Sequence, residues 1–389
     1  MDFTALEADL RRWRRHVHEH PELSYQEFQT AAYVESELRA MGIQEIEAPT
    51  PTSRTAVIRG ELADSRPTRT FAIRADMDAL PVEEAEGLPF RSLNSGVSHA
   101  CGHDAHVAML LGTAKMLWAK RALFAGAVKL IFQHAEEKSP GGAVELVKAG
   151  VLEGVDACMG LHVMNGRSGH IDVCVSPTAS SSADGVWIEV AGCGTHASVP
   201  QGGVDPILVG AEIVSALHTI VSRSIAPDRF AVVSPTIFQG GGVINVIPHN
   251  ATIAASIRAK TASDRRLIKE RVETIAMGIA SAHGAHVSFR WEEGCPAVVQ
   301  DPGMAERALR VAKTIVPPDH VHAGAGMSGS EDFSYFSEQV PSVYVILGGG
   351  DVSEGYPYQN HHPAFRFNES VLLIGTQMET AMALDFLRD

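Results

Sequence analysis

The sequence predicts an α/β protein that combines a mainly parallel, helix-covered sheet with an inserted ferredoxin-like α+β domain. Two observations predict this fold class. Apolar strands alternate with helical segments over the first half of the chain, as in parallel sheets whose two faces are covered by helices. From about residue 183 the order changes to the β-α-β-β-α-β pattern of a ferredoxin-like unit, and near residue 295 the first pattern returns.

The first expected element is a helix at 4–17, in which apolar residues recur at helical spacing until Pro21 ends the run. Strands and helices then alternate. The expected elements are helix 25–41, strands 55–59 and 70–74, helix 106–119, strand 127–132, helix 143–148 and strand 157–161.

The insertion is expected to cover 183–294, so the first domain is discontinuous and covers 1–182 and 295–389. A chain of 389 residues is long enough for two domains. The elements expected in the insertion are strand 186–190, helix 206–223, strands 231–238 and 251–259, helix 262–283 and strand 286–291. After the insertion, helices 303–315 and 369–387 are expected to flank strand 343–347.

The composition argues against several classes of function. A formal net charge of -14, without a basic block, leaves no surface for phosphates, so we expect no nucleic-acid partner. No apolar run approaches the roughly 20 residues of a membrane-spanning helix, and the first residues do not resemble a signal peptide. The five cysteines are odd in number and scattered, unlike a secreted disulfide framework, and four of them are expected to be small buried residues. We therefore expect a cytoplasmic protein without a membrane partner.

The densest group of metal-ligating side chains lies at 98–106, Ser-His-Ala-Cys-Gly-His-Asp-Ala-His. Thiol and imidazole groups suit zinc and its first-row neighbours, whereas magnesium and calcium prefer oxygen ligands. Cys101 and His103 are candidate ligands, but they are too few, so further ligands must come from distant segments. Taken alone, the pair favours a plainer interpretation in which Cys101 is a buried thiol and His103 supports a turn.

Ionisable side chains follow three of the expected strands. They are Asp76, Asp78, Glu136, Glu137 and His162. Because ligands of parallel sheets bind beyond the carboxyl ends of the strands, we expect these side chains to meet at one rim. The adjacent carboxylates of Glu136 and Glu137 would repel one another if both were buried without a cation. The alternative is an exposed acidic loop beside a structural histidine, and the local sequence leaves that alternative open.

Further candidates lie in loops and on one strand. His361 and His362 belong to an irregular segment rich in Gly, Tyr and Pro, of the kind that often closes a site. Inside the expected insertion, two Gly-rich turns carry His196 and Asn245. Arg258 lies on an apolar strand, where an unpaired charge is costly, so it requires an anionic partner from the protein or from a substrate.

Five motifs occur in a fixed order along the chain: 74–81 (RADMDALP), 99–106 (HACGHDAH), 132–137 (FQHAEE), 160–162 (GLH) and 329–333 (GSEDF). In sequence and order these motifs resemble the metal-dependent aminoacylase and amidohydrolase family. That family includes hippurate hydrolases, N-acyl-amino-acid deacylases and auxin-conjugate hydrolases. The resemblance extends over nearly the whole chain.

The resemblance implies two divalent metal ions, of zinc, manganese, cobalt or nickel, held by five side chains: Cys101, His103, Glu137, His162 and His361. It implies that Glu136 is the general base, that Asp78 orients a ligand, and that His196 polarises the scissile carbonyl. It also implies that Asn245 and Arg258 hold the carboxylate of the substrate.

This chain departs from the family pattern at a few positions. The family usually has Pro at the position of His134, which makes His134 a candidate for an additional weak ligand or acid. It has Lys and Gly at the positions of Cys193 and Thr195, and His at that of Gln201. These departures leave the conformation of the lid turn and the substrate preference open.

The activity that the resemblance implies is hydrolysis of the amide bond of small N-acyl amino acids or related conjugates, by a metal-bridged water that Glu136 activates. A dipeptidase or carboxypeptidase with the same metal chemistry is the alternative. A catalytically silent metal- or ligand-binding relative is disfavoured, because Glu136 is present. The resemblance also implies a homodimer, or a dimer-based homo-oligomer, in which the insertion serves as lid and dimerisation domain.

Overall fold

A computed structural model of the chain describes residues 3–63 and 68–388. The chain forms two compact units. The first comprises Met1–Ala179, Val298–Gly326 and Asp332–Asp389, and the second comprises Ser180–Ala297 and Met327–Glu331. The second unit begins and ends three residues outside the expected range of 183–294, and it also takes in Met327–Glu331.

The first unit is built on an eight-stranded sheet. Its strands are β1 (Ile46–Glu47), β2 (Arg54–Arg59), β3 (Thr70–Asp76), β4 (Ala127–Gln133), β5 (Ala157–Met164), β6 (Ile171–Cys174), β13 (Val321–Gly324) and β14 (Ser342–Gly348). Their order across the sheet is β1-β2-β4-β3-β5-β14-β6-β13. The four central strands β4, β3, β5 and β14 are parallel, whereas β1, β2 and β6 pair antiparallel with neighbours. The predicted parallel-rich sheet is therefore confirmed.

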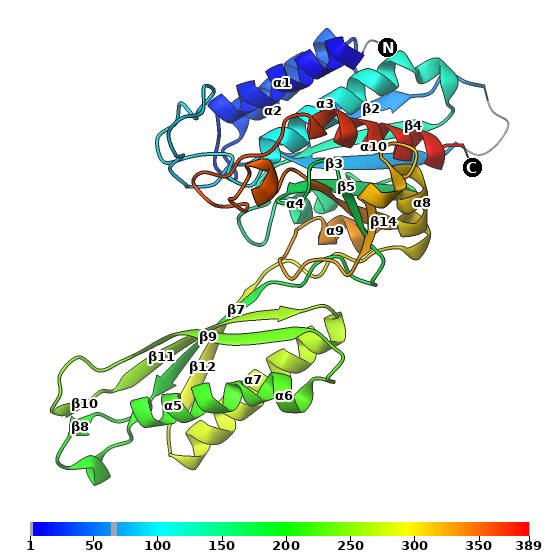
Figure 1. Cartoon of the computed structure of the whole chain (residues 1–389). Coiled ribbons are helices and arrows are strands. Elements are labelled where there is room, and N and C mark those ends of the chain that lie inside the picture. Colours follow the sequence, from blue (N-terminus) through cyan, green and yellow to red (C-terminus); the bar gives the residue numbers. More distant parts are fainter. Residues whose placement is uncertain (1–2, 64–67, 389) are drawn as a thin grey trace. The chain divides into compact units, whose positions relative to one another are not determined.

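Helices cover this sheet, and for that reason its central strands are almost continuously buried. After Thr70 every residue of β3 is buried, and so is every residue of β5 before Met164. The helices are α1 (Phe3–Glu19), α2 (Phe28–Ala40), α3 (His103–Ala119), α4 (Ala143–Lys148), α8 (Pro302–Ala312), α9 (Ser334–Ser337) and α10 (Val371–Phe386). Figure 1 shows α1, α3 and α10 above the sheet and α4 and α9 below it.

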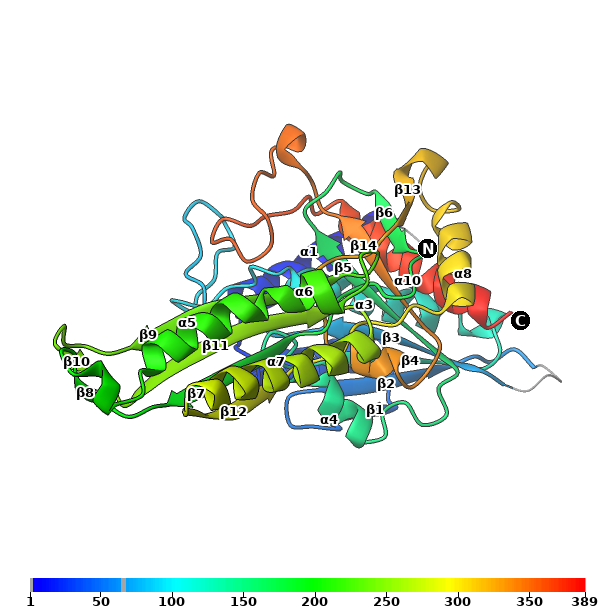
Figure 2. The same cartoon turned by 90° about the horizontal axis from the view of Figure 1, so that it is seen from below.

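The second unit contains a four-stranded antiparallel sheet of order β12-β7-β11-β9. Its elements are β7 (Asp184–Ala191), α5 (Pro206–Leu217), α6 (Thr219–Ser224), β9 (Ala231–Gly240), β11 (Asn250–Ala259), α7 (Ala262–Ala282) and β12 (His286–Glu293). In Figures 1 and 2, α5 and α7 lie side by side along this sheet. A small ribbon of β8 (Thr195–His196) and β10 (Val246–Ile247) lies at one end of the unit.

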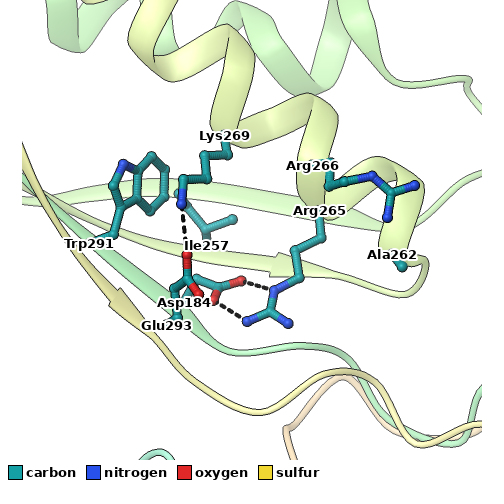
Figure 3. Close-up of a pocket in the computed structure, with 8 residues that line it drawn as sticks. All are labelled: Asp184, Ile257, Ala262, Arg265, Arg266, Lys269, Trp291 and Glu293. Atoms are coloured by element: carbon teal, nitrogen blue, oxygen red, sulfur yellow. Dashed lines mark hydrogen bonds and ion pairs between the residues drawn. The ribbon is translucent and has the colours of Figure 1, made fainter. Parts of the chain in front are cut away.

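Ion pairs join α7 to the edge of this sheet around a small pocket (Figure 3). Arg265 donates two hydrogen bonds to the carboxylate of Asp184, at 2.7 and 2.5 Å. Lys269 lies 2.7 Å from Glu293 and packs over the ring of Trp291 at 5.0 Å. The charges of Arg265, Asp184, Lys269 and Glu293 therefore neutralise one another in two ion pairs. We interpret these ion pairs as stabilising the second unit.

The elements differ from the sequence-based expectation at several points. The strand expected to end at residue 161 continues to Met164, because it pairs with β14 as far as Gly348. The helix expected at 206–223 is interrupted at His218, between α5 and α6. The short strands β1, β6, β8, β10 and β13 were not expected.

No helix in the described ranges combines the length and the apolar character that crossing a bilayer requires. The described cysteines form no disulfide, and Cys158, Cys174 and Cys295 are buried as expected. The expectation was wrong for Cys193, which is exposed beside the β8 ribbon.

Candidate active site

The candidate site lies where β4, β3 and β5 end side by side. Because β3 pairs in parallel with both neighbours, their carboxyl ends meet at one rim, as the sequence predicted. Asp76 is the last residue of β3, and Glu136 and Glu137 follow the end of β4. His162 lies within β5 rather than beyond it.

Cys101 and His103 reach this rim from the beginning of α3. Gly102, the residue between them, has a φ of 91°, a left-handed conformation that favours glycine. The thiol of Cys101 is 3.5 Å from Nε2 of His162. The structure therefore brings together Cys101, His103 and His162, whose potential ligand atoms lie within 4.8 Å of one another.

A second and a third group share members with the first. Cys101, Glu137 and His361 form one of them, and His103, Glu136 and Glu137 form the other, again with potential ligand atoms within 4.8 Å. All five side chains that were predicted as metal ligands thus converge on one place, beside Glu136.

His361, rather than His362, joins this cluster. Its Nε2 is 3.3 Å from Oε1 of Glu137, and its backbone N–H donates to the carbonyl of Ala100 at 2.7 Å. His362 instead stacks on Tyr358, with ring centroids 4.1 Å apart, and its Nδ1 accepts from the N–H of Ala364. The choice of His361 in the sequence analysis agrees with this geometry.

Asp78 orients two of the candidate ligands. Nδ1 of His103 lies 2.9 Å from the carbonyl oxygen of Asp78 and 3.3 Å from its carboxylate. A carbonyl only accepts, so Nδ1 carries the proton and the lone pair of Nε2 is directed into the site. The other carboxylate oxygen of Asp78 accepts from the N–H of Glu137 at 3.0 Å and from Ser24 at 2.7 Å.

Asp76 belongs to a buried network behind the site. Arg74 donates to Asp76 at 2.6 Å, to Asp332 at 2.7 Å and to Gln133 at 2.7 Å. Gln133 in turn donates to both oxygens of Asp332, at 2.8 and 2.7 Å. This network fixes the ends of β3 and β4 and explains why the motifs at 74–81, 132–137 and 329–333 occur together.

His106 is held on both sides and does not point a free nitrogen at the site. Its Nδ1 is 2.5 Å from Asp76, and its Nε2 accepts from the N–H of Val163 at 2.9 Å. Because a backbone N–H only donates, the proton of His106 resides on Nδ1. His106 therefore supports β5 next to His162 instead of competing as a ligand.

The cluster has the properties of a cation site. Within the described part of the chain, Nε2 of His103 and Oε1 of Glu137 are buried without a hydrogen bond. Burial lowers the pKa of His103, but Asp76 and Cys101 outweigh it and raise that pKa well above its ordinary value. Burial, together with Glu137, raises the pKa of the Cys101 thiol. A buried imidazole nitrogen and a buried carboxylate oxygen without hydrogen-bond partners are suited to bind a metal cation, so the residues present fit one.

His134 does not join the cluster, contrary to its candidacy as a weak ligand or acid. The residue is buried, but Nε2 lies 3.1 Å from Glu145 and Nδ1 lies 3.4 Å from Thr50. Both ring nitrogens are therefore engaged with residues outside the candidate ligand set.

The second unit brings His196 and Asn245 together. Val246 pairs with His196 in the β8–β10 ribbon, and the N–H of Ala197 donates to the carbonyl of Asn245 at 3.0 Å. Nδ1 of His196 accepts from the N–H of Ser198 at 3.1 Å. The neutral ring therefore carries its proton on Nε2, which makes exposed His196 a hydrogen-bond donor.

Arg258 is half-buried on β11, next to Val232 of β9. Among the described residues, its side chain makes one polar contact, a long one of 3.4 Å to the hydroxyl of Ser330. The described residues supply no carboxylate partner for Arg258. The anionic partner that the sequence analysis expected for Arg258 could therefore be a ligand.

Sequence reasoning missed two residues of the supporting structure, Ser24 and Glu27. Ser24 lies in the connection between α1 and α2, and Glu27 immediately precedes α2, within the helix expected at 25–41. Asn360 was also missed, although it donates to the carbonyl of Cys101 at 2.8 Å. The contacts of these residues are made with segments far away in the sequence, so no local signal identifies them.

The chain matches the model of peptidase family M20/M25/M40 over residues 72–385. The N-acyl-L-amino acid amidohydrolase of Geobacillus stearothermophilus is 42% identical over 313 residues, which cover 78% of this chain and 83% of the relative. Thermostable carboxypeptidase 2 of Saccharolobus solfataricus is 36% identical over 376 residues, covering 96% and 94%. The crystal structure of a dinuclear metal-binding peptidase from Bacillus subtilis has a TM-score of 0.85 at 33% identity and covers 99% of each chain. The chain therefore belongs to peptidase family M20/M25/M40.

Proposed function

We propose that this protein is a metal-dependent amidohydrolase that cleaves the amide bond of small N-acyl amino acids or related conjugates. The observation that carries the proposal is the convergence of Cys101, His103, Glu137, His162 and His361 beside a second carboxylate, Glu136. The name of the Geobacillus relative supports the substrate class.

The five converging side chains would hold two divalent cations. A thiol, three imidazoles and a carboxylate suit zinc, manganese, cobalt or nickel. When bound, such cations lower the pKa of a water and polarise a carbonyl. The dinuclear Bacillus peptidase, a relative over nearly the whole chain, supports the number of ions.

Glu136 is the general base of the proposed reaction. Its neighbour Glu137 is oriented by Asp78 and faces His361, and Glu136 lies within the same cluster, where a carboxylate can exchange a proton with a bound water. It would take a proton from the attacking water and deliver it to the leaving amine, a role that requires one carboxylate near both atoms.

Residues of the second unit would complete the reaction. The Nε2–H of His196 is suited to stabilise the oxyanion, because Ser198 already occupies Nδ1. Arg258 and Asn245 would bind the carboxylate of the amino acid. In this proposal the second unit acts as a lid and as the dimerisation surface of a cytoplasmic homodimer.

A carboxypeptidase or dipeptidase is the second candidate, favoured by the likeness to the Saccharolobus carboxypeptidase. The two activities share the metal chemistry and differ in the acyl side of the substrate. A panel of acetyl and benzoyl amino acids, measured beside dipeptides and longer peptides, separates them by kcat/KM.

The test of the proposal is elemental analysis of the purified protein, coupled to an amine-release screen with and without chelator. We expect about two metal ions per chain and chelator-sensitive release of amino acids from N-acyl substrates. A fully metal-loaded protein that hydrolyses no amide would contradict the proposal and would favour a silent ligand-binding relative.

A further inference from the structure

Glu27 is a buried acid for which the proposed reaction has no use. Its side chain is fully buried at the N-cap position of α2, where a side-chain acceptor can bind the first N–H groups of the helix. Glu27 makes no such cap. Glu22 takes over that task and accepts from the N–H groups of Gln29 and Thr30 at 3.1 and 2.8 Å. The carboxylate of Glu27 is thus free to bind elsewhere.

The carboxylate of Glu27 binds the loop that carries the acid pair, Glu136 and Glu137. Oε1 of Glu27 accepts from the N–H of Ala135 at 2.8 Å and from that of Tyr25 at 3.0 Å. Ala135 directly precedes Glu136. In the described residues the second oxygen of Glu27, Oε2, is buried without a hydrogen bond. Burying a carboxylate oxygen without a hydrogen bond is energetically unfavourable, so the hydrogen bonds that Glu27 makes through its other oxygen matter to the structure.

The contact falls on a strained residue. Ala135 has a φ of 52°, a left-handed conformation that is unfavourable for a residue with a Cβ atom. Its carbonyl accepts from the N–H of Gly142 at 2.9 Å, so Ala135 is held at both its N–H and its carbonyl. At Gly142 a Cβ atom would lie 2.0 Å from the carbonyl oxygen of His134, so only glycine fits there.

The same segment holds the other side of the acid pair. Ser24 donates to the carboxylate oxygen of Asp78 that also accepts from the N–H of Glu137. Residues 24–27 therefore hold the loop on both sides of Glu136. Glu27 binds the residue before it, and Ser24 supports the residue after it through Asp78. Asp78 and burial act together to raise the pKa of Glu27 to about 7.

We propose that Glu27 is a positioning residue, which fixes the left-handed turn at Ala135 and thereby directs Glu136 to the reacting atoms. The inference rests on the proposed function, because it presupposes that Glu136 transfers the proton. Glu27 exerts its effect through the backbone of Ala135, the residue directly before Glu136, whose N–H donates to its carboxylate.

The experiment compares Glu27→Ala and Glu27→Gln with a matched control, Glu22→Ala. Glu22 belongs to the same segment but caps α2 instead of binding the loop. In metal-saturated enzyme we expect Glu27→Ala to lower kcat about 10- to 100-fold with KM within about twofold of wild type. Glu27→Gln should retain most of kcat, because its amide oxygen still accepts from both N–H groups.

Hydrogen exchange of the Ala135 amide provides a readout that does not depend on turnover. We expect exchange at Ala135 to become faster in Glu27→Ala and to stay unchanged in Glu22→Ala. A wild-type kcat and unchanged exchange in Glu27→Ala would overturn the inference, as would an equal loss of kcat in the Glu22→Ala control. An inactive wild-type enzyme would instead contradict the proposed function, while the exchange measurement would still test whether Glu27 holds the backbone of Ala135.

Discussion

The Asp78 carboxylate accepts a hydrogen bond from the backbone N–H of Glu137 at 3.0 Å, while the carbonyl of Asp78 lies 2.9 Å from Nδ1 of His103. Asp78, which follows the end of β3, thus orients two candidate ligands that come from two other segments of the chain. Such outer partners fix the tautomer and direction of a ligand, and they matter almost as much as the ligand itself.

Replacing Asp78 should therefore impair both metal binding and turnover. We expect Asp78→Ala to weaken metal affinity about 10- to 100-fold, the range usual for outer partners of metal ligands. Metal titration in a competing chelator measures this affinity. Ser24→Ala, which removes one hydrogen bond to the same carboxylate, serves as the milder control. Because the variant keeps the backbone carbonyl that contacts His103, wild-type affinity would show that His103 and Glu137 hold their positions without the carboxylate.

Replacing Glu136 should separate chemistry from metal binding. Glu136→Gln keeps the size of the side chain but removes the base, so kcat should fall about 10²- to 10⁴-fold. Metal content, measured by elemental analysis, should remain that of the wild type. Glu137→Gln is the matched comparison, since we expect it to lose metal as well as activity. A Glu136→Gln enzyme with wild-type turnover on every acyl amino acid would contradict the proposed base.

Replacing His106 should affect stability more than metal content. His106→Ala leaves Oδ1 of buried Asp76 and the N–H of Val163 without the partner that His106 provides, although Arg74 still donates to Oδ2 of Asp76. The cost is about 1–3 kcal/mol for each group that stays unpaired. We expect a lower free energy of unfolding in urea, but a protein that still binds two ions at saturating metal. Loss of one ion under those conditions, in a folded variant, would identify His106 as a ligand.

Glu379 predicts a pH-dependent stability that is unrelated to the site. This acid is fully buried between α10 and α3, where it accepts from Thr113 at 2.7 Å, and burial raises its pKa to about 8. The folded protein binds this proton more tightly than the unfolded chain does. The contribution of Glu379 to the free energy of unfolding is therefore fully present below the ordinary pKa of about 4.5. It is lost as the pH rises through about 8.

Glu379→Gln should remove that loss, because glutamine does not ionise and still accepts from Thr113. We expect the melting temperature of the variant, relative to wild type, to rise between pH 5 and pH 9. Thermal unfolding of both proteins at several pH values checks this expectation. A constant difference across the range would mean that Glu379 does not titrate with a raised pKa.

The sequence predicted the central strands and the rim because these depend on local patterns. β3, β4 and β5 are mainly apolar, and ionisable residues lie at or just beyond their carboxyl ends, where parallel sheets bind ligands. The convergence of His361 with Cys101 followed only from the resemblance, since more than 250 residues separate them in the chain.

What the sequence could not predict are contacts made between distant segments. β6 and β13 are four-residue strands whose pairing is set by their partners rather than by their own composition. Glu27 falls inside the helix that the sequence predicted at 25–41, and only the folded chain brings it to Ala135, 108 residues away. The extension of β5 past Leu161 likewise depends on β14 as a pairing partner.

The position of β14 constrains the order in which the protein is completed during synthesis. β14 lies between β5 and β6, and the β6–β13 pair is connected to the rest of the sheet only through it. A ribosome-bound chain can form β1 to β5 early, since domains begin to fold from the N-terminus as they emerge. The sheet is nevertheless interrupted until β14 has left the ribosome, and His361 follows β14 in the chain. The five candidate ligands are therefore unable to meet in a nascent chain that has not yet released β14.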